Sequence, residues 1–160
     1  MSTAVEQRLV QLWKTPRTVH GFLGTVDHKE IGRRYVATSL LFLIVGGLEA
    51  LVTRLQLAGP NNSLLTPEMY DQIFTMHGMT MIFWYAQPIL SGFAVFLVPL
   101  MIGSRDMAFP RFNAYTYWAF LFSGVLLYIG PFLGQAPHGG WFAYVPYTNR
   151  PYSPGYGMDF

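Results

Sequence analysis

Thirty consecutive residues without a charged side chain, residues 73–102, constrain this chain more than any other feature. They read IFTMHGMTMIFWYAQPILSGFAVFLVPLMI. Because a bilayer crossing needs about 20 predominantly apolar residues, this run is long enough for a tilted transmembrane helix. The composition agrees, since only 11% of the 160 residues are charged, against about 25% in an average soluble domain. We therefore predict an all-α membrane protein.

Three apolar runs predict three transmembrane helices, over residues 35–57, 70–102 and 115–132. The remaining segments are an N-terminal arm, two connecting loops and a final segment rich in Gly, Pro and Tyr, at residues 1–34, 58–69, 103–114 and 133–160. The arm has no apolar run of signal-peptide length, so we expect no cleaved leader. Pro88, inside the second run, predicts a kink.

Positive charge predicts the orientation of the chain, because short cytoplasmic loops carry an excess of Lys and Arg. The arm and the loop at residues 103–114 are basic, the loop at residues 58–69 has no Lys or Arg, and the final segment has only Arg150. We predict a multi-pass protein of a bacterial-type plasma membrane, with the N-terminus cytoplasmic and residues 133–160 outside. A net charge of +2 does not suggest nucleic-acid binding.

His77 lies inside the longest uncharged run, where an imidazole without a partner is costly. It could hydrogen-bond a neighbouring helix, or it could bind a metal or cofactor. Gly78 removes a side chain from the next position, so a flat group could come close. Arg54, near the outer end of the first crossing, should lie at a similar depth, which favours a shared cofactor. With no cysteine in the chain, a haem would be held by coordination and packing alone.

The remaining charged and imidazole groups are assigned more local roles. Glu49 and Arg54 are five residues apart, about 140° around a helix, so we expect no pairing between them. Each then needs its own partner. We expect His20, His28 and His138 to lie outside the membrane core, and we interpret His28 as part of a solvated interfacial cap.

Four motifs resemble the N-terminal part of subunit I of the haem–copper terminal oxidases, the family of cytochrome c oxidase. They are DHK, RLQL, MHGMTMIF and VPLMIGSRDMAFPR, at residues 27–29, 54–57, 76–83 and 98–111. The resemblance runs from about residue 25 to residue 160. It implies a bundle of twelve transmembrane helices, three of them in this chain, and reduction of oxygen to water with proton translocation.

The resemblance implies a role for each candidate site residue. His77 would be an axial ligand of the low-spin haem, of a or b type, and Arg54 would hydrogen-bond a peripheral group of that haem. Trp141, with Tyr144 close by, would lie near the haem propionates on the outer side. An interfacial aromatic belt would explain Trp141 equally well.

The resemblance also implies a proton-uptake path that begins at Asp106 and includes Asn113. The predicted inner position of Asp106 agrees with that role. Two plainer interpretations stay open: Asp106 could pair with Arg105 or Arg111, and Asn113 could cap the third crossing.

The chain departs from the family pattern at several positions. Val95 stands where many relatives carry a channel asparagine, so the water path can differ. Gln56 replaces a metal-binding glutamate, so we expect no ion there. In the quinol-oxidising branch an arginine and a histidine contact the quinone, and Val45 and Met69 occupy their places here. Of the polar residues at that quinone site, only the acidic one is retained, as Glu49. We therefore expect cytochrome c, or a fused or associated cytochrome, as electron donor.

The oxygen-reducing groups are expected elsewhere in the subunit. The second axial ligand, the oxygen-binding haem and copper should lie beyond Phe160, so this chain alone should not reduce oxygen. Expected partners are subunits II and III and the lipid bilayer. Two alternatives stay open: a quinol oxidase or nitric oxide reductase relative, and a non-catalytic three-span protein for haem carriage or assembly.

Overall fold

The computed structural model describes residues 5–7 and 18–157, and in that part of the chain it contains helices, turns and no strand. Most of the predicted basic arm, residues 1–4 and 8–17, lies outside the described residues, as do residues 158–160. The helices, in chain order, are α2 (Val19–Gly24), α3 (His28–Gln56), α4 (Pro67–Met79), η1 (Thr80–Ala86), α5 (Gln87–Met101) and α6 (Pro110–Phe132). The prediction of an all-α fold is confirmed.

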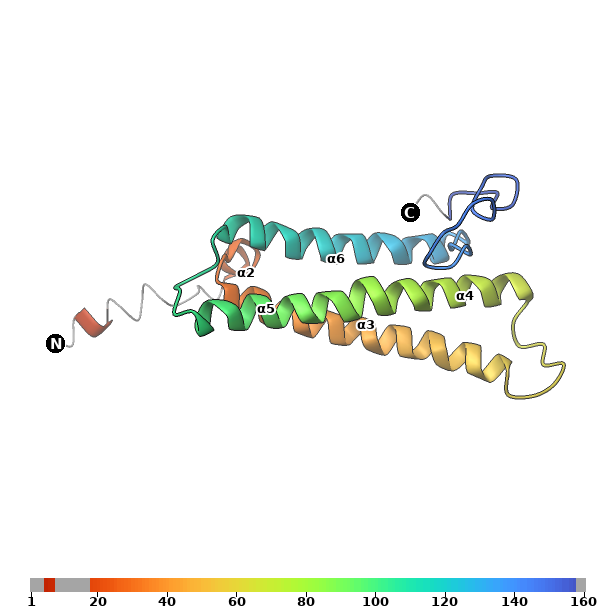
Figure 1. Cartoon of the computed structure of the whole chain (residues 1–160), viewed down its shortest axis with the longest axis horizontal. Coiled ribbons are helices and arrows are strands. Elements are labelled where there is room, and N and C mark those ends of the chain that lie inside the picture. Colours follow the sequence, from red (N-terminus) through yellow and green to blue (C-terminus); the bar gives the residue numbers. More distant parts are fainter. Residues whose placement is uncertain (1–4, 8–17, 158–160) are drawn as a thin grey trace.

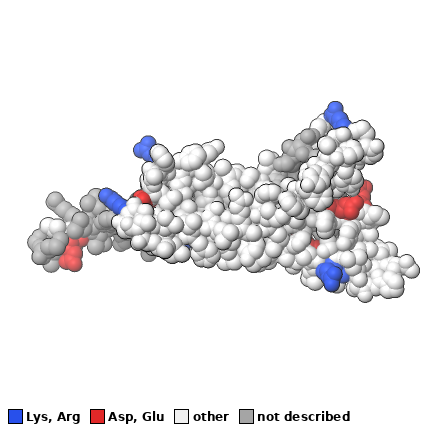
Figure 2. Space-filling view, viewed as in Figure 1, with Lys and Arg blue, Asp and Glu red and all other residues white. Residues whose placement is uncertain are grey.

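Three helical stretches of the described chain are long and apolar enough to cross a membrane: His28–Gln56, Pro67–Met101 and Pro110–Phe132. They lie side by side along the long axis of the molecule (Figure 1). Figure 2 shows charged side chains near the two ends of the molecule and none over its middle on this face. This distribution suits a protein whose middle faces lipid, and the predicted set of three membrane-spanning helices is confirmed.

The first two crossings begin before their apolar runs because a capping side chain starts each of them. The side chain of Asp27 accepts a hydrogen bond from the Lys29 N–H at 2.9 Å, so α3 begins seven residues before residue 35. Thr66 caps α4 in the same way, and Pro67 occupies its first turn. The prediction from apolar runs missed these first turns because their residues are polar.

The second crossing widens into one π-helical stretch, η1, just before Pro88. The N–H of Gln87 donates to the carbonyl of Ile82, five residues back. Proline lacks an N–H and crowds the carbonyl four residues back, so an irregular turn ahead of it relieves both problems. A π-helix that begins three residues after His77 thus precedes Pro88, and the kink predicted at Pro88 stays a prediction.

Close backbone contact joins α3 to α5, and aromatic rings join α3 to α6. A Cβ added to Gly92 would lie 2.8 Å from the Cβ of Tyr35, so only glycine allows this approach. On the α6 side, the ring centroids of Tyr35 and Tyr117 are 5.3 Å apart at an angle of 77°. Ile31 is buried with these two rings, and together they fix the end of the bundle where α3 begins.

Candidate cofactor site around His77

His77 lies in the last turn of α4, and its half-buried ring points at α3. Its Nδ1 is 2.8 Å from the carbonyl oxygen of Gly46. A carbonyl only accepts, so Nδ1 carries the proton and donates it, which leaves the lone pair of the neutral ring on Nε2. No hydrogen bond to Nε2 is found in the described part of the chain. The ring therefore has the form of a metal ligand oriented through its second nitrogen.

Gly46 permits this approach of α3 to the second crossing. A Cβ at this position would lie 2.8 Å from the Sδ of Met81 and 3.3 Å from the Cγ2 of Thr80. Both contacts are with side chains of η1, the stretch that follows His77. The small residue thus brings the α3 backbone within hydrogen-bonding distance of the imidazole.

The final segment folds over α4 and brings Trp141 against Gly78, the residue that follows His77. The N–H of Gly140 donates to the hydroxyl of buried Thr75 at 2.9 Å. A Cβ on Gly78 would lie 3.3 Å from the Cδ1 of Trp141. The flat group against Gly78 in this structure is therefore the indole of Trp141.

The structure does not bring Arg54 and Tyr144 into contact with His77. Arg54 is exposed in the last turn of α3, and no hydrogen bond or ion pair of its guanidinium is found among the described residues. Tyr144 is 73% exposed, and its ring packs against that of Phe142 at 5.3 Å between centroids. Their expected roles stay predictions.

Glu49 has a partner that sequence reasoning missed. The hydroxyl of Tyr128, on α6, donates to its Oε1 at 3.0 Å, and the same hydroxyl lies 2.6 Å from the Oγ1 of Thr80. No ion pair joins Glu49 to Arg54 in the described chain, as expected. A carboxyl in a membrane helix signals that a partner is needed, but no signal along the sequence selects Tyr128, which is 79 residues away.

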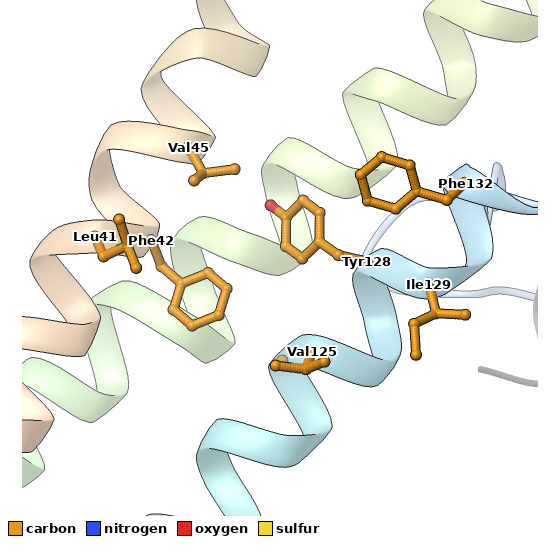
Figure 3. Close-up of a pocket in the computed structure, with 8 residues that line it drawn as sticks. Leu41, Phe42, Val45, Val125, Tyr128, Ile129 and Phe132 are labelled. Carbon is orange, nitrogen blue, oxygen red and sulfur yellow. The ribbon is translucent and has the colours of Figure 1, made fainter.

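An apolar groove lies between α3 and α6, and Tyr128 is part of its wall (Figure 3). Its volume is about 330 Å³. Its walls are Leu41, Phe42, Val45, Gly124, Val125, Tyr128, Ile129 and Phe132. Figure 3 shows Tyr128 reaching from α6 into the space between the helices. The Tyr128 hydroxyl is the polar group among these side chains.

At the other end of the bundle, two expectations for polar residues are wrong. His28 is only 1% exposed and therefore is not part of a solvated cap; Asp27 caps α3 instead. His28 shares the buried stripe of α3 with Ile31 and Tyr35, at helical spacing. Asn113 does not cap α6, because that helix begins at Pro110 and its first turn already includes Asn113.

The proposed proton-path residues have different surroundings. Asp106 lies in the loop before α6, and its Oδ1 accepts from the Met107 N–H at 2.8 Å. Asn113 is 8% exposed, and its Nδ2 has no hydrogen-bond partner among the described residues. No described contact joins the two, and their role in proton uptake stays a prediction.

Gln56 organises the loop that follows α3. Its Nε2 donates to the carbonyl of Asn62 at 2.7 Å, and its Oε1 accepts from the N–H of Leu65 at 2.7 Å. Both ends of the amide are therefore used within the loop. A glutamate could accept but could not donate, so the amide suits this loop without an ion.

Comparison with known proteins gives one family. Residues 30–160 match the sequence model of the family described as cytochrome c and quinol oxidase polypeptide I. The chain is 46% identical over 142 residues to a haem–copper oxidase subunit I+III from Aeropyrum pernix, covering 88% of this chain and 17% of that protein. It is 45% identical over 139 residues to cytochrome c oxidase subunit 1 from Bacillus subtilis, covering 87% of this chain and 22% of that protein. The chain thus spans about a fifth of the length of these relatives.

Proposed function

Because the chain belongs to the cytochrome c and quinol oxidase polypeptide I family, we propose that it forms the low-spin haem site of a respiratory terminal oxidase. In this proposal the chain is the N-terminal part of subunit I, and His77 supplies one axial ligand. The observation that carries the proposal is the hydrogen bond between His77 Nδ1 and the Gly46 carbonyl at 2.8 Å, which leaves Nε2 as the ligand atom.

The residues around His77 fit a haem by their chemistry. Neutral imidazole is a usual ligand of haem iron, and His77 would hold the haem through Nε2. Oxidases of this family also need a second axial ligand, an oxygen-binding haem and copper, and we assign these to the parts of subunit I that this chain does not cover. When bound, the low-spin haem supplies a one-electron carrier between the donor and the oxygen-reducing centre.

The protein groups then have separate tasks. The Gly46 carbonyl fixes the tautomer and orientation of His77. Arg54 donates to a peripheral group of the haem and stabilises negative charge there, while Trp141 covers the outer side of the His77 turn. Asp106 takes up protons from the inner side, and Asn113 lines the path that these protons follow. These roles match the family motifs and the orientation predicted from charge.

Cytochrome c, or an associated cytochrome, is the donor that we propose. Relatives named cytochrome c oxidase subunit 1 support this choice, and so does Val45, an apolar residue in the groove wall where the quinol branch carries an arginine. A relative named subunit I+III supports a subunit III partner. Subunit II would be the remaining partner, because the donor must pass its electrons across a subunit boundary.

Replacement of His77 by alanine tests the proposal in the assembled oxidase. We expect His77→Ala to abolish the reduced-minus-oxidised absorbance of the low-spin haem, because packing cannot replace a coordinate bond. The matched control is His20→Ala, which removes an exposed imidazole from α2. A low-spin spectrum that survives His77→Ala, with haem content unchanged, would refute the proposed site.

A further inference from the structure

A directed chain of hydrogen bonds connects three helices through Tyr128. The single hydroxyl proton of Tyr128 is donated to Glu49 Oε1 at 3.0 Å. In the 2.6 Å hydrogen bond between Thr80 and Tyr128, the Thr80 hydroxyl must then be the donor and the Tyr128 oxygen the acceptor. The order is therefore Thr80 to Tyr128 to Glu49, from η1 through α6 to α3, with the carboxyl as the final acceptor.

Both ends of this series of hydrogen bonds lie one helical turn from the hydrogen bond that orients His77. Thr80 follows His77 by three residues along the second crossing, and Glu49 follows Gly46 by three residues along α3. Residues three apart share one face of a helix. The Glu49 carboxyl is thus held close to the imidazole that the proposed function assigns to the iron.

The second carboxyl oxygen of Glu49 is buried and has no hydrogen-bond partner among the described residues. A negative charge there is costly, because burial removes the water that would stabilise it. Of the titratable groups on the facing helices, Tyr128 from α6 donates to Oε1, and His77 from α4 bonds the Gly46 carbonyl one turn before Glu49. Neither forms an ion pair with Glu49 in the described chain. Arg54, on α3 itself, is directed about 140° away around the helix. A proton on Oε2 would remove the charge and leave Oε1 free to accept from Tyr128.

We propose that Glu49 is a proton-binding site coupled to the redox state of the haem held by His77. The inference rests on the proposed function. Reduction of a haem held by His77 would add negative charge nearby, and the carboxylate of Glu49 would then form one O–H bond at Oε2 with a proton taken from water. When the added electron moves on to the oxygen-reducing centre, the O–H bond breaks and the proton returns to water. Tyr128 and Thr80 position the carboxyl and hold Oε1.

The midpoint potential of the low-spin haem, measured against pH in the purified oxidase, tests this coupling. In the unaltered protein we expect the potential to fall as pH rises, because reduction then brings a proton with it. In Glu49→Gln this slope should be lost, with haem content and the low-spin spectrum retained. The matched control is Glu68→Gln, an exposed carboxyl in the first turn of α4, which should keep the slope. An equal slope in Glu49→Gln and the unaltered protein would overturn the proposal.

Infrared difference spectra between the reduced and oxidised states give an independent readout. We expect the carbonyl band of a protonated carboxyl to appear on reduction, and this band should shift in Tyr128→Phe because Oε1 loses its donor. Tyr115→Phe, on the exposed side of α6, should leave the band unchanged. If Glu49→Gln fails to assemble, the carboxyl band by itself tests the coupling. The coupling is refuted if no such band appears on reduction, or if Tyr128→Phe does not shift it. Survival of the haem spectrum in His77→Ala would instead refute the haem site itself.

Discussion

At the scale of single residues, the ring of His77 makes a structural contact that is compatible with the ligand role we propose for it. Sequence reasoning treated a hydrogen bond to a neighbouring helix and a cofactor role as alternatives. The hydrogen bond to Gly46 exists, and it uses only one of the two ring nitrogens. Because the donated proton fixes the tautomer, the same bond that satisfies the imidazole also prepares Nε2 for a metal.

Replacing Arg54 should change the absorbance and midpoint potential of the haem without changing the stability of the chain. We expect Arg54→Met to shift the absorbance and midpoint potential of the low-spin haem while leaving the haem bound. The guanidinium has no partner among the described residues, so its loss should cost this chain little stability. Redox titration followed optically measures both effects, with Arg150→Met, an exposed residue of the final segment, as control. If neither quantity moves, Arg54 does not belong to the site.

Asp27 makes the stability of the start of α3 depend on pH. Partial burial tends to raise the pKa of this carboxyl, but hydrogen bonds and charge from Lys29 outweigh burial and hold the pKa below its usual value. A lowered pKa means that the cap stabilises the fold above the unfolded pKa of about 4, and that this contribution is lost as pH falls through the folded value.

We therefore expect Asp27→Ala to destabilise the protein by about 1 kcal/mol at neutral pH. The difference from the unaltered protein should shrink in acid, because the protonated carboxyl is a weaker acceptor. Thermal unfolding of the purified protein at several pH values measures this. Asp27→Asn is the control, since an amide oxygen caps a helix without titrating. A difference that does not change with pH would contradict the assignment of Asp27 as a charged cap.

At the scale of helices, close approach of α3 and α5 depends on missing side chains. A Cβ on Gly92 would lie 2.8 Å from Tyr35 Cβ and 3.1 Å from the Val36 backbone nitrogen. These atoms cannot rotate away, so the helices themselves would have to move. A similar added atom on Gly47 of α3 would meet nothing within 4 Å.

We expect Gly92→Ala to destabilise the bundle by about 1–3 kcal/mol through overpacking, and Gly47→Ala to be neutral or slightly stabilising because alanine favours helix. Thermal unfolding and the yield of assembled protein in membranes would measure both variants. Equal stability of the two variants would mean that α3 and α5 are not in close contact in the membrane.

At the scale of the whole molecule, an apolar middle lies between two charged ends (Figure 2). This arrangement agrees with three crossings, but it does not distinguish which end faces the cytoplasm. The orientation prediction rests on the basic residues before α3 and between α5 and α6. It therefore needs a chemical test in membranes.

Single cysteines give that test, because this chain contains none of its own. We expect Ser63→Cys, in the loop after α3, to react with a membrane-impermeant maleimide in intact cells. Ala108→Cys, before α6, should react only after the membrane is permeabilised. Both positions are exposed. The reverse pattern would invert the topology and place Asp106 on the outer side, away from its proposed role.

The sequence alone determined the number of crossings and the helical class, because apolar length is a signal that can be read along a chain. It also singled out His77, an isolated imidazole in an apolar run, as the candidate ligand. It also pointed to the family, through motifs that lie close together. Only the tertiary structure decided that His28 is buried, that Gln56 hydrogen-bonds the loop after α3, and that Tyr128 donates a hydrogen bond to Glu49. The physical reason is that these depend on groups brought together by packing, as in the hydrogen bonds of His77 and Glu49, which span 31 and 79 residues.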